Sequence, residues 1–375
     1  MRNILFHCST PFQIMMSIHL RTTLKKNDKV DIIVSNHIKD GDMIVKGLLP
    51  LGIFGNVFYF DGLKYDSLPK GNLQKIELIS HVFLRRYDMN HLLNKEHKNK
   101  KVYNELWIQE ILTSTNVLYD YLRKINRNLK VCFYEESPLT VLCDGHDTFI
   151  SRIEAKEKMS KLERILYAFT FQSTYGRFEK GYSSIAKRIR KKYYFPFYEI
   201  PNLRENQKLL GLCNAVWDPT DEYSGKVVYF EESFYIDAIE FDDMKIVNDI
   251  VAIVGKENLI VKLHPRTKHD RFRPLGIRTN RHTNIPWELI VWNHLHNSPI
   301  LISVASGSLI YPQIYLGIEQ KAIALIKCSD YKKPILKSKY YKTYLEFCEN
   351  EGIVSLPNTR DEFRNLLYEL VKERK

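Results

Sequence analysis

The feature that most constrains the fold is an alternation of short apolar segments with helix-like segments, which occurs twice along the chain. In the first part of the sequence the expected strands are residues 4–7, 30–35, 57–60 and 130–134. Helical periodicity follows from Pro11 to about Leu24 and in a long amphipathic stretch over 103–125. Such alternation is typical of an α/β domain with a mainly parallel sheet, because helices then cross between successive strands.

The same alternation begins again in the second half. Its expected strands are 226–230, 258–263, 300–304 and 322–327, and its expected helices are 242–254, 286–296 and one from about Ser308. The intervening stretch is charged and aromatic without strand alternation, which indicates a helical connector. The sequence therefore predicts four parts, namely an α/β domain over 1–160, the connector over 161–222, a second α/β domain over 223–357 and a C-terminal helix over 358–375.

Composition supports two domains of an intracellular protein. With 375 residues and 44% hydrophobic content, the chain exceeds what one ordinary core organises. No apolar run approaches the roughly 20 residues that span a bilayer, and the N-terminus enters a strand without a signal-peptide pattern. The six cysteines are scattered without Cys-x-x-Cys pairs or zinc spacing. We expect a cytoplasmic protein with reduced thiols and no structural metal.

The net charge of +12 includes a basic and aromatic segment at 187–197. Such a segment could dock on an anionic membrane surface, which would make the protein peripheral on the inner face of the cytoplasmic membrane. It could equally be a solvated basic face that runs into buried aromatic residues. No nucleic-acid-binding motif accompanies the charge, so we expect no nucleic-acid partner.

The second expected strand of the second domain stops at a His-Pro pair. His264 and Pro265 follow it directly, and Lys262 and Arg266 flank them. Parallel sheets bind ligands at the carboxyl ends of their strands, where a histidine can donate a proton near neutral pH. His264 is therefore the leading candidate for a general acid or hydrogen-bond donor toward an anionic leaving group. The alternative is a histidine with only a structural role at the end of the strand.

The next strand of that domain ends in small hydroxyl residues and glycine. Ser303, Ser306, Gly307 and Ser308 precede a predicted helix, and serine hydroxyls with backbone N–H groups there would bind a phosphate. An ordinary serine cap is the alternative for this turn.

The first strand of the chain also ends in polar residues. Ser9, Thr10 and Pro11 are explained by helix capping about as well as by substrate contact, but capping does not explain Gln13.

Two segments offer carboxylates for deprotonating an acceptor hydroxyl. Glu135 and Glu136 follow the strand at 130–134, and the segment 229–237 carries Glu231, Glu232 and Asp237. Solvated loop carboxylates are the alternative for both segments. The sequence lacks Gly-x-Gly-x-x-Gly after a strand, a Walker loop, a Gly-x-Ser-x-Gly elbow and His-Glu-x-x-His, and this favours chemistry without a metal or a bound cofactor.

Taken in order and spacing, these motifs resemble bacterial sialyltransferases, with glycosyltransferase family 52, the lipooligosaccharide sialyltransferase group, as the nearest match and polysialyltransferases as relatives. The resemblance implies a GT-B fold, in which two Rossmann-like domains face a central cleft. It also implies inverting, metal-independent transfer from CMP-sialic acid to a surface glycan, with the first domain on the acceptor side and the second binding the nucleotide sugar.

The resemblance also implies a role for each motif. His264 would act as the acid on the departing CMP phosphate, and the serine turn would bind that phosphate with support from Lys262, Pro265 and Arg266. The base would be Asp237, at the place of an acidic segment upstream of the His-Pro motif, or Glu136, in the counterpart of a Glu-Asp-Gly motif. The residues Ser9, Thr10, Pro11, Gln13 and Glu135 would contact substrate.

Other assignments remain open at this stage. A GT-B transferase could use a UDP-sugar, or CDP-glycerol as in teichoic-acid type glycerophosphotransferases. A protein that binds glycans or membranes without catalysis is a further alternative. A homodimer is possible for any of them, and the lipooligosaccharide or capsular acceptor is not specified by the sequence.

Overall fold

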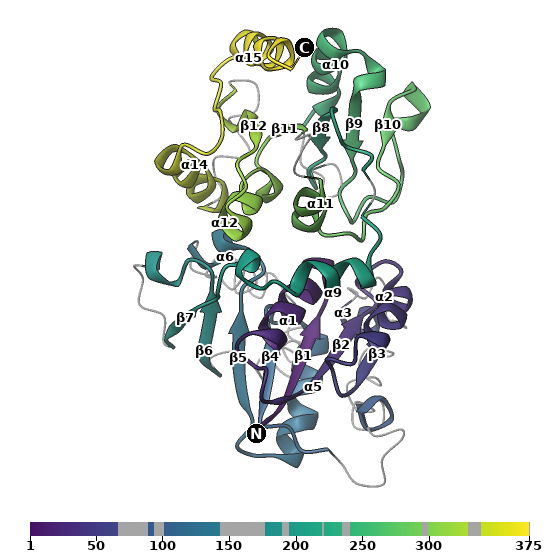
Figure 1. Ribbon diagram of the computed structural model, residues 1–375, viewed down its shortest axis with the longest axis vertical. Helices are drawn as coiled ribbons and strands as arrows, with labels where there is room; N and C mark the ends of the chain where they lie inside the picture. Colours follow the sequence, from purple (N-terminus) through teal and green to yellow (C-terminus); the bar gives the residue numbers. More distant parts are fainter. Residues whose placement is uncertain are drawn as a thin grey trace, which may run out of the picture. The chain divides into compact units, whose positions relative to one another are not determined.

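The computed structural model describes residues 1–66, 89–93, 101–142, 177–189, 195–219, 221–234, 241–294, 299–328 and 339–374. The chain divides into two compact units, unit 1 at Met1–Asp218 and unit 2 at Pro219–Lys375. Each unit is built around a parallel sheet (Figure 1).

Unit 1 contains a sheet whose described strands run in the order β3-β2-β1-β4-β5-β6-β7, with every neighbouring pair parallel. The strands are β1 (Asn3–Cys8), β2 (Lys29–Ser35), β3 (Val57–Phe60), β4 (Glu105–Ile108), β5 (Lys130–Tyr134), β6 (Phe178–Ser183) and β7 (Phe197–Glu199). The strand order reverses at β1, so the crossovers leaving β1 and those leaving β4 run in opposite directions along the sheet. This arrangement is the one found in Rossmann-like domains.

Helices cover the sheet of unit 1 because alternate strand residues face opposite sides. The described helices are α1 (Pro11–Thr22), α2 (Gly41–Leu48), α3 (Leu63–Asp66), α5 (Thr113–Ile125), α6 (Pro138–Leu142) and α9 (Leu209–Val216). Helix α9 packs against α1 and α2, as Figure 1 shows, whereas α3 packs against α5. Leu5, Ile33 and Leu106 belong to one buried cluster with apolar residues of α5.

Unit 2 repeats the same strand order with fewer strands, in the order β10-β9-β8-β11-β12, again all parallel. The strands are β8 (Val227–Phe230), β9 (Leu259–Lys262), β10 (Arg278–Thr279), β11 (Ile300–Ser303) and β12 (Lys321–Ala324). The helices are α10 (Asp243–Val254), α11 (Trp287–Asn293), α12 (Tyr311–Leu316), α14 (Lys339–Glu351) and α15 (Arg360–Lys372). The order reverses at β8, so the loops that follow β8 and β11 lie at the point where such sheets bind ligands.

The prediction of a helical connector over 161–222 is wrong for its described part, because β6 and β7 extend the sheet of unit 1. Strand β6 contains the charged residues Glu179 and Lys180, which hid it from a search for apolar runs. Its inward residues are nonetheless buried, and α9 is the helical part of this stretch. The unit boundary falls at residues 218 and 219, a few residues before the predicted start of the second domain.

The aromatic residues of the segment 187–197 partly belong to the core. Phe195 is 9% exposed, and its ring centroid lies 5.5 Å from that of Phe178 and 5.1 Å from that of Phe197. The interpretation of this segment as buried aromatic sequence is therefore correct for Phe195. Residues 190–194 lie outside the part of the chain that is described.

A buried carboxylate holds one end of the unit 1 sheet. Glu105, at the start of β4, accepts hydrogen bonds from Arg2 Nη1 at 2.7 Å, Lys180 Nζ at 3.0 Å and Trp107 Nε1 at 2.8 Å. The Nζ atom of Lys25 lies 4.0 Å from the same carboxylate and is itself buried. Burial alone would raise the pKa of Glu105, but the hydrogen bonds and the nearby cations outweigh it and lower the pKa.

We expect Glu105→Gln to destabilise unit 1, because removing one partner of a buried ion pair leaves buried Lys25 uncompensated. The expected loss is about 3 kcal/mol in the free energy of unfolding, measured by urea denaturation. The control is Glu199→Gln, which breaks an ion pair between exposed side chains. The side chain of Glu199 is 48% exposed and that of its partner Lys187 is 82% exposed. Equal effects of the two substitutions would show that the Glu105 cluster does not stabilise the unit.

Candidate functional site

The His-Pro turn of unit 2 lies directly after β9, where the sequence predicts it. The backbone N–H of His264 donates to Glu231 Oε2 at 3.0 Å, and the backbone N–H of Arg266 donates to His264 Nδ1 at 3.2 Å. Since Nδ1 accepts a hydrogen bond, the proton of the neutral ring is on Nε2. The imidazole is half-buried, and Pro265 and Arg266 are exposed in the turn.

Lys262, the cation before this turn, is buried rather than exposed. Its side chain is among the buried residues of unit 2, and its Nζ lies 5.9 Å from the ring centroid of Phe230. Burial lowers the pKa of Lys262, although the charges of Glu288 and Glu222 act in the opposite direction. Burial likewise raises the pKa of Glu288 to about 7. Of the two cations that flank His264, only Arg266 is therefore exposed.

The serine turn follows β11. Ser303 is fully buried, whereas Ser306, Gly307 and Ser308 are partly exposed. Ser306 Oγ accepts a hydrogen bond from the backbone N–H of Ser308 at 3.3 Å. The helix predicted from about Ser308 is instead a 3₁₀ turn over Gly307–Leu309, followed by the short helix α12. A phosphate would therefore be bound by hydroxyls and single N–H groups more than by a long helix dipole.

Gly307 has a packing reason to be glycine. A Cβ atom at this position would lie 2.3 Å from ring atoms of Tyr311, well inside van der Waals contact. The turn is closed from the other side by Tyr344, whose hydroxyl donates to the carbonyl oxygen of Ser306 at 3.3 Å. The hydroxyl of Tyr344 thus restrains the backbone of the turn, and the ring of Tyr311 packs against Gly307.

The candidate carboxylates after β8 are not solvated loop residues. Glu231 is 5% exposed and contacts the His264 turn, and Glu232 Oε1 accepts hydrogen bonds from Ser303 Oγ at 2.6 Å and Ala305 N at 2.9 Å. Burial raises the pKa of Glu232, and these hydrogen bonds lower it less. Asp237, the other predicted base, lies outside the described residues.

In unit 1, the polar residues after β1 form a small network around Gln13. Thr10 caps α1 by accepting from Gln13 N at 3.3 Å, and Pro11 occupies the first turn of the helix. Gln13 is 1% exposed; its Oε1 accepts from Ser9 N at 2.5 Å and Ser9 Oγ at 3.1 Å, and its Nε2 donates to Glu136 Oε2 at 3.1 Å. The network connects the loop after β1 to the loop after β5.

Glu135 and Glu136 differ in their surroundings. Glu135 is fully buried, and its carboxylate accepts hydrogen bonds from Ser184 N at 2.6 Å and from Ser183 Oγ, so its side chain faces the β6 loop. Glu136 as a residue is partly exposed, although its carboxylate group lies below the surface. Burial of the carboxylate raises the pKa of Glu136, and hydrogen bonds from Thr10, Gln13 and Glu110 lower it by less. Glu136 is therefore the better placed of the two for exchanging a proton.

Sequence reasoning missed two features of the unit 1 strand ends. Glu110 hydrogen-bonds with Glu136, and it was overlooked because β4 was read as part of a helix over 103–125. After β2, His37 contacts Ser35 Oγ through Nδ1 at 2.7 Å and approaches Asp66 through Nε2 at 3.4 Å. The signal available for both was a pair of polar residues after a strand, Gln109 and Glu110 after β4 and Asn36 and His37 after β2.

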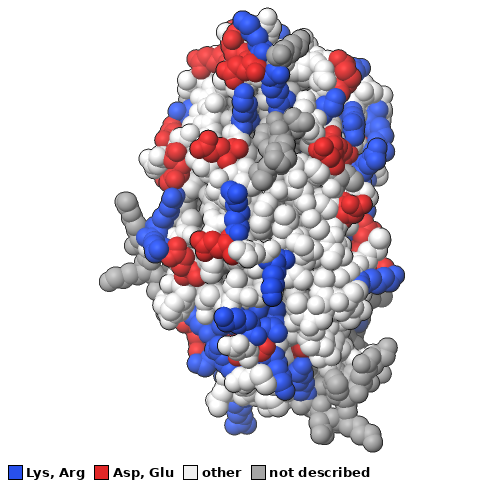
Figure 2. All heavy atoms as spheres, viewed as in Figure 1, with Lys and Arg blue, Asp and Glu red and all other residues white. Residues whose placement is uncertain are grey.

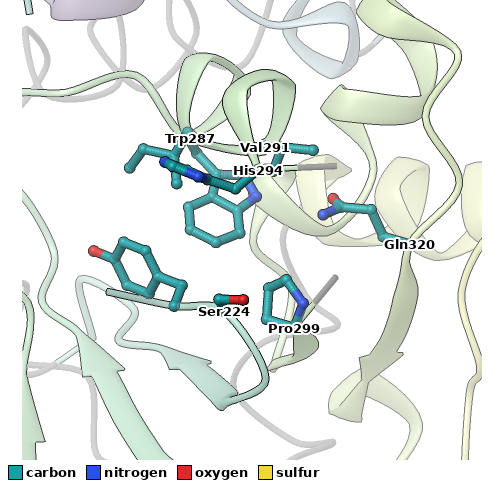
Figure 3. Close-up of a pocket in the computed structure, with 8 residues that line it drawn as sticks. Ser224, Trp287, Val291, His294, Pro299 and Gln320 are labelled. Carbon is teal, nitrogen blue, oxygen red and sulfur yellow. The ribbon is translucent and has the colours of Figure 1, made fainter. Parts of the chain in front are cut away.

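A shallow pocket of unit 2 lies at the other edge of its sheet (Figure 3). Its lining includes Pro299 and Gln320, which directly precede β11 and β12, and Ser224, which lies three residues before β8. Trp287 and His294 also line it. The amino ends of parallel strands are opposite the carboxyl ends that carry His264 and Ser306. The pocket is therefore separate from the candidate site.

Among the described residues, no group of three or more histidines, cysteines or acidic residues is arranged to hold a metal ion. Within the same residues, no helix combines the length and the apolar character needed to cross a membrane.

Solved structures with the same fold are GT-B glycosyltransferases. LpCGTa in complex with UDP is 10% identical and has a TM-score of 0.52 over 99% of this chain and 90% of that chain. UGT89C1 from Arabidopsis thaliana, complexed with UDP-L-rhamnose, is 11% identical with a TM-score of 0.51 over 100% and 90%. The glycosyltransferase of kitacinnamycin is 9% identical with a TM-score of 0.50 over 99% and 90%. These likenesses confirm the predicted GT-B fold.

The sequence itself carries the family assignment. No curated protein sequence matches the chain significantly. The family model described as alpha-2,8-polysialyltransferase (POLYST) matches residues 4–324, which include all the described strands of both units except the first residue of β1. The chain therefore belongs to the alpha-2,8-polysialyltransferase family and is a glycosyltransferase with a GT-B fold.

Proposed function

We propose that this protein transfers sialic acid from CMP-sialic acid to a hydroxyl group of a bacterial surface glycan, either lipooligosaccharide or capsular polysaccharide. Membership of the alpha-2,8-polysialyltransferase family supports the sialyl group. The surface-glycan acceptor is supported by the motif resemblance to bacterial sialyltransferases alone. The observation that carries the proposal is the His264 turn, in which Nδ1 accepts a hydrogen bond from the backbone and Nε2 carries the proton. In the sheet, only β8 lies between the strand that precedes this turn and the strand that precedes the serine turn.

The proposed reaction is a direct displacement that inverts the anomeric carbon. The bond from that carbon to the CMP phosphate breaks, and a bond to the acceptor oxygen forms. The transition state resembles an oxocarbenium ion, so neutralising the phosphate contributes more than a strong nucleophile does. His264 Nε2–H would donate a hydrogen bond to the phosphate, which departs as the CMP anion, and Ser306 and Ser308 would bind it. Glu136 or Asp237 would accept the proton of the acceptor hydroxyl. No metal takes part in this scheme.

The first test is donor turnover by the wild type and by His264→Ala. We expect release of CMP from CMP-sialic acid in the presence of EDTA, and a fall of roughly 10²–10⁴-fold in kcat for the variant. The matched control is His269→Ala, which removes an exposed histidine from the same loop and should leave turnover unchanged.

The donor panel should include CDP-glycerol and several UDP-sugars. If the protein turned over only a UDP-sugar, or only CDP-glycerol, that compound and not CMP-sialic acid would be its donor. Absence of turnover with any donor would favour a glycan-binding protein without catalysis. Turnover by His264→Ala at the wild-type rate would remove His264 from the proposed mechanism.

The second test concerns Glu136 as base, which acts only when ionised. The hydrogen bond from Gln13 Nε2 stabilises the carboxylate and so lowers a pKa that burial raises. Gln13→Leu removes this donor, and the pKa of Glu136 should rise further. We therefore expect the acid limb of the kcat profile to shift to higher pH in this variant.

The control for this shift is Gln109→Leu, because Gln109 Nε2 donates to the backbone carbonyl of Glu135 at 3.3 Å and not to a carboxylate. An acid limb that stays in place in Gln13→Leu, together with full activity of Glu136→Gln, would assign the base to Asp237.

We also propose that the basic segment beginning at Lys187 contacts an anionic membrane surface. Each lysine or arginine near such a surface contributes about 1 kcal/mol. Phe195 is buried in the core, so cations would supply most of the attraction. On the face in Figure 2, acidic side chains lie among the basic ones, which makes a local contact more reasonable than a broad one.

Liposome flotation tests this contact. The wild type should float with vesicles that contain anionic lipid, and less so at high salt. Lys187→Glu with Arg188→Glu should weaken flotation, whereas Lys39→Glu with Lys46→Glu makes the same charge change at exposed positions elsewhere in unit 1. Equal flotation of both double variants would exclude the segment as the contact.

A further inference from the structure

Two adjacent glutamates follow β8, the strand at which the order of the unit 2 sheet reverses. Neighbouring residues of an extended segment direct their side chains to opposite sides. Glu231 contacts the loop after β9, and Glu232 contacts the loop after β11. These are the two loops that carry His264 and the serine turn.

The Glu231 carboxylate closes the His264 loop. Its Oε2 accepts from the backbone N–H of His264 at 3.0 Å and from Thr267 Oγ1 at 2.6 Å. Within the loop, Thr267 N donates to the carbonyl oxygen of His264 at 2.8 Å. Hydrogen bonds to an ionised acceptor are about twice as strong as neutral ones, so the carboxylate restrains the loop more than a neutral side chain would.

Arg271 holds Glu231 in place from the other side. Its Nη2 lies 3.0 Å from Glu231 Oε1, and its Nη1 donates to Asp243 Oδ1 at 2.8 Å. Asp243 is the first residue of α10 and is buried. The chain Asp243–Arg271–Glu231 therefore connects a helix terminus to the backbone of His264.

Glu232 makes the equivalent connection to the serine turn. Its Oε1 accepts from Ser303 Oγ at 2.6 Å, at the end of β11, and from the backbone N–H of Ala305 at 2.9 Å. Ala305 directly precedes Ser306, so this contact fixes the backbone from which the turn begins.

We propose that Glu231 and Glu232 are a pair of positioning residues, Glu231 for His264 as the hydrogen-bond donor to the departing phosphate and Glu232 for the phosphate-binding turn at Ser306 and Ser308. The inference rests on the proposed function for the roles of His264 and the serines. Both loops leave short strands, and reacting groups must be held within about 0.5 Å of their productive positions. A displacement of 1 Å can reduce the rate about 10²-fold.

The pair predicts a division between kinetic parameters. Glu231→Gln should lower kcat by roughly 10- to 100-fold with little change in the donor KM, because it displaces His264 from the departing phosphate. Glu232→Gln should raise the donor KM and the Kd of CMP, because it displaces the turn that binds the phosphate in the ground state. A merely structural role would give both variants the same kinetic change.

Amide hydrogen exchange of the unliganded protein, read by mass spectrometry, tests the pair without any reaction. Exchange should become faster in peptides covering 264–267 for Glu231→Gln only, and in peptides covering 303–306 for Glu232→Gln only. Asp249→Asn is the control, since Asp249 bonds Arg360 on α15 and lies outside both loops. Thr267→Val and Ser303→Ala replace the glutamine variants if these do not fold. Thr267→Val removes one contact of Glu231 and Ser303→Ala one contact of Glu232, so each should increase exchange in the same loop as the corresponding glutamine variant, but by less.

Equal exchange in both loops for each variant, or a pattern that matches Asp249→Asn, would overturn the inference. Kinetic changes that do not divide between kcat and KM would also overturn it. If the wild type turns over none of the donors, the proposed function fails, and the exchange pattern alone then decides whether the glutamates fix their loops.

Discussion

The organisation of this protein depends on one constraint, the reversal of strand order in each parallel sheet. All strands of a sheet point the same way, so the residues that follow them gather at one edge, and the reversal at β1 and at β8 separates the loops on either side. In unit 1 the loops after β1 and β5 lie at the same edge of the sheet, and a hydrogen bond from Gln13 to Glu136 connects them. In unit 2 it places the His264 turn and the serine turn on the two sides of the β8 loop.

Much of this fold could be predicted because parallel strands buried on both faces are short continuous apolar runs. β1, β2, β3 and β9 all lie where the sequence indicates. β4 was missed because it is only four residues long and ends only four residues before α5, so that helical periodicity dominated the stretch. β6 was missed because the charge of its Lys180 is balanced by Glu105, which is 75 residues away in sequence. Periodicity reports only local neighbours and carries no sign of such a partner.

The sequence predicted where the candidate site residues lie at the strand ends, but not which way their side chains point. The positions of His264 and Ser306 follow from strand ends alone, and both lie where they were expected. The carboxylates were harder, since an acidic residue after a strand reads the same whether its side chain faces solvent or the protein. Glu231 and Glu232 face inward because N–H and O–H donors from the β9 and β11 loops satisfy them. Lys262 reads as a surface cation beside His264 but is buried near Glu288.

The two units share one feature at their strand ends, a pair of adjacent glutamates that bind neighbouring loops. Glu135 and Glu136 after β5, like the pair after β8, diverge to opposite neighbours, here the β6 loop and Gln13 of the β1 loop. Glu135, Glu231 and Glu232 accept hydrogen bonds from backbone N–H groups, which stabilise the ionised form and fix a loop. Burial nevertheless raises the pKa of Glu232, and it raises the pKa of Glu136 in spite of the hydrogen bond from Gln13. A carboxylate with a raised pKa takes up a proton more readily, which is the property that a base needs when it accepts one from a sugar hydroxyl.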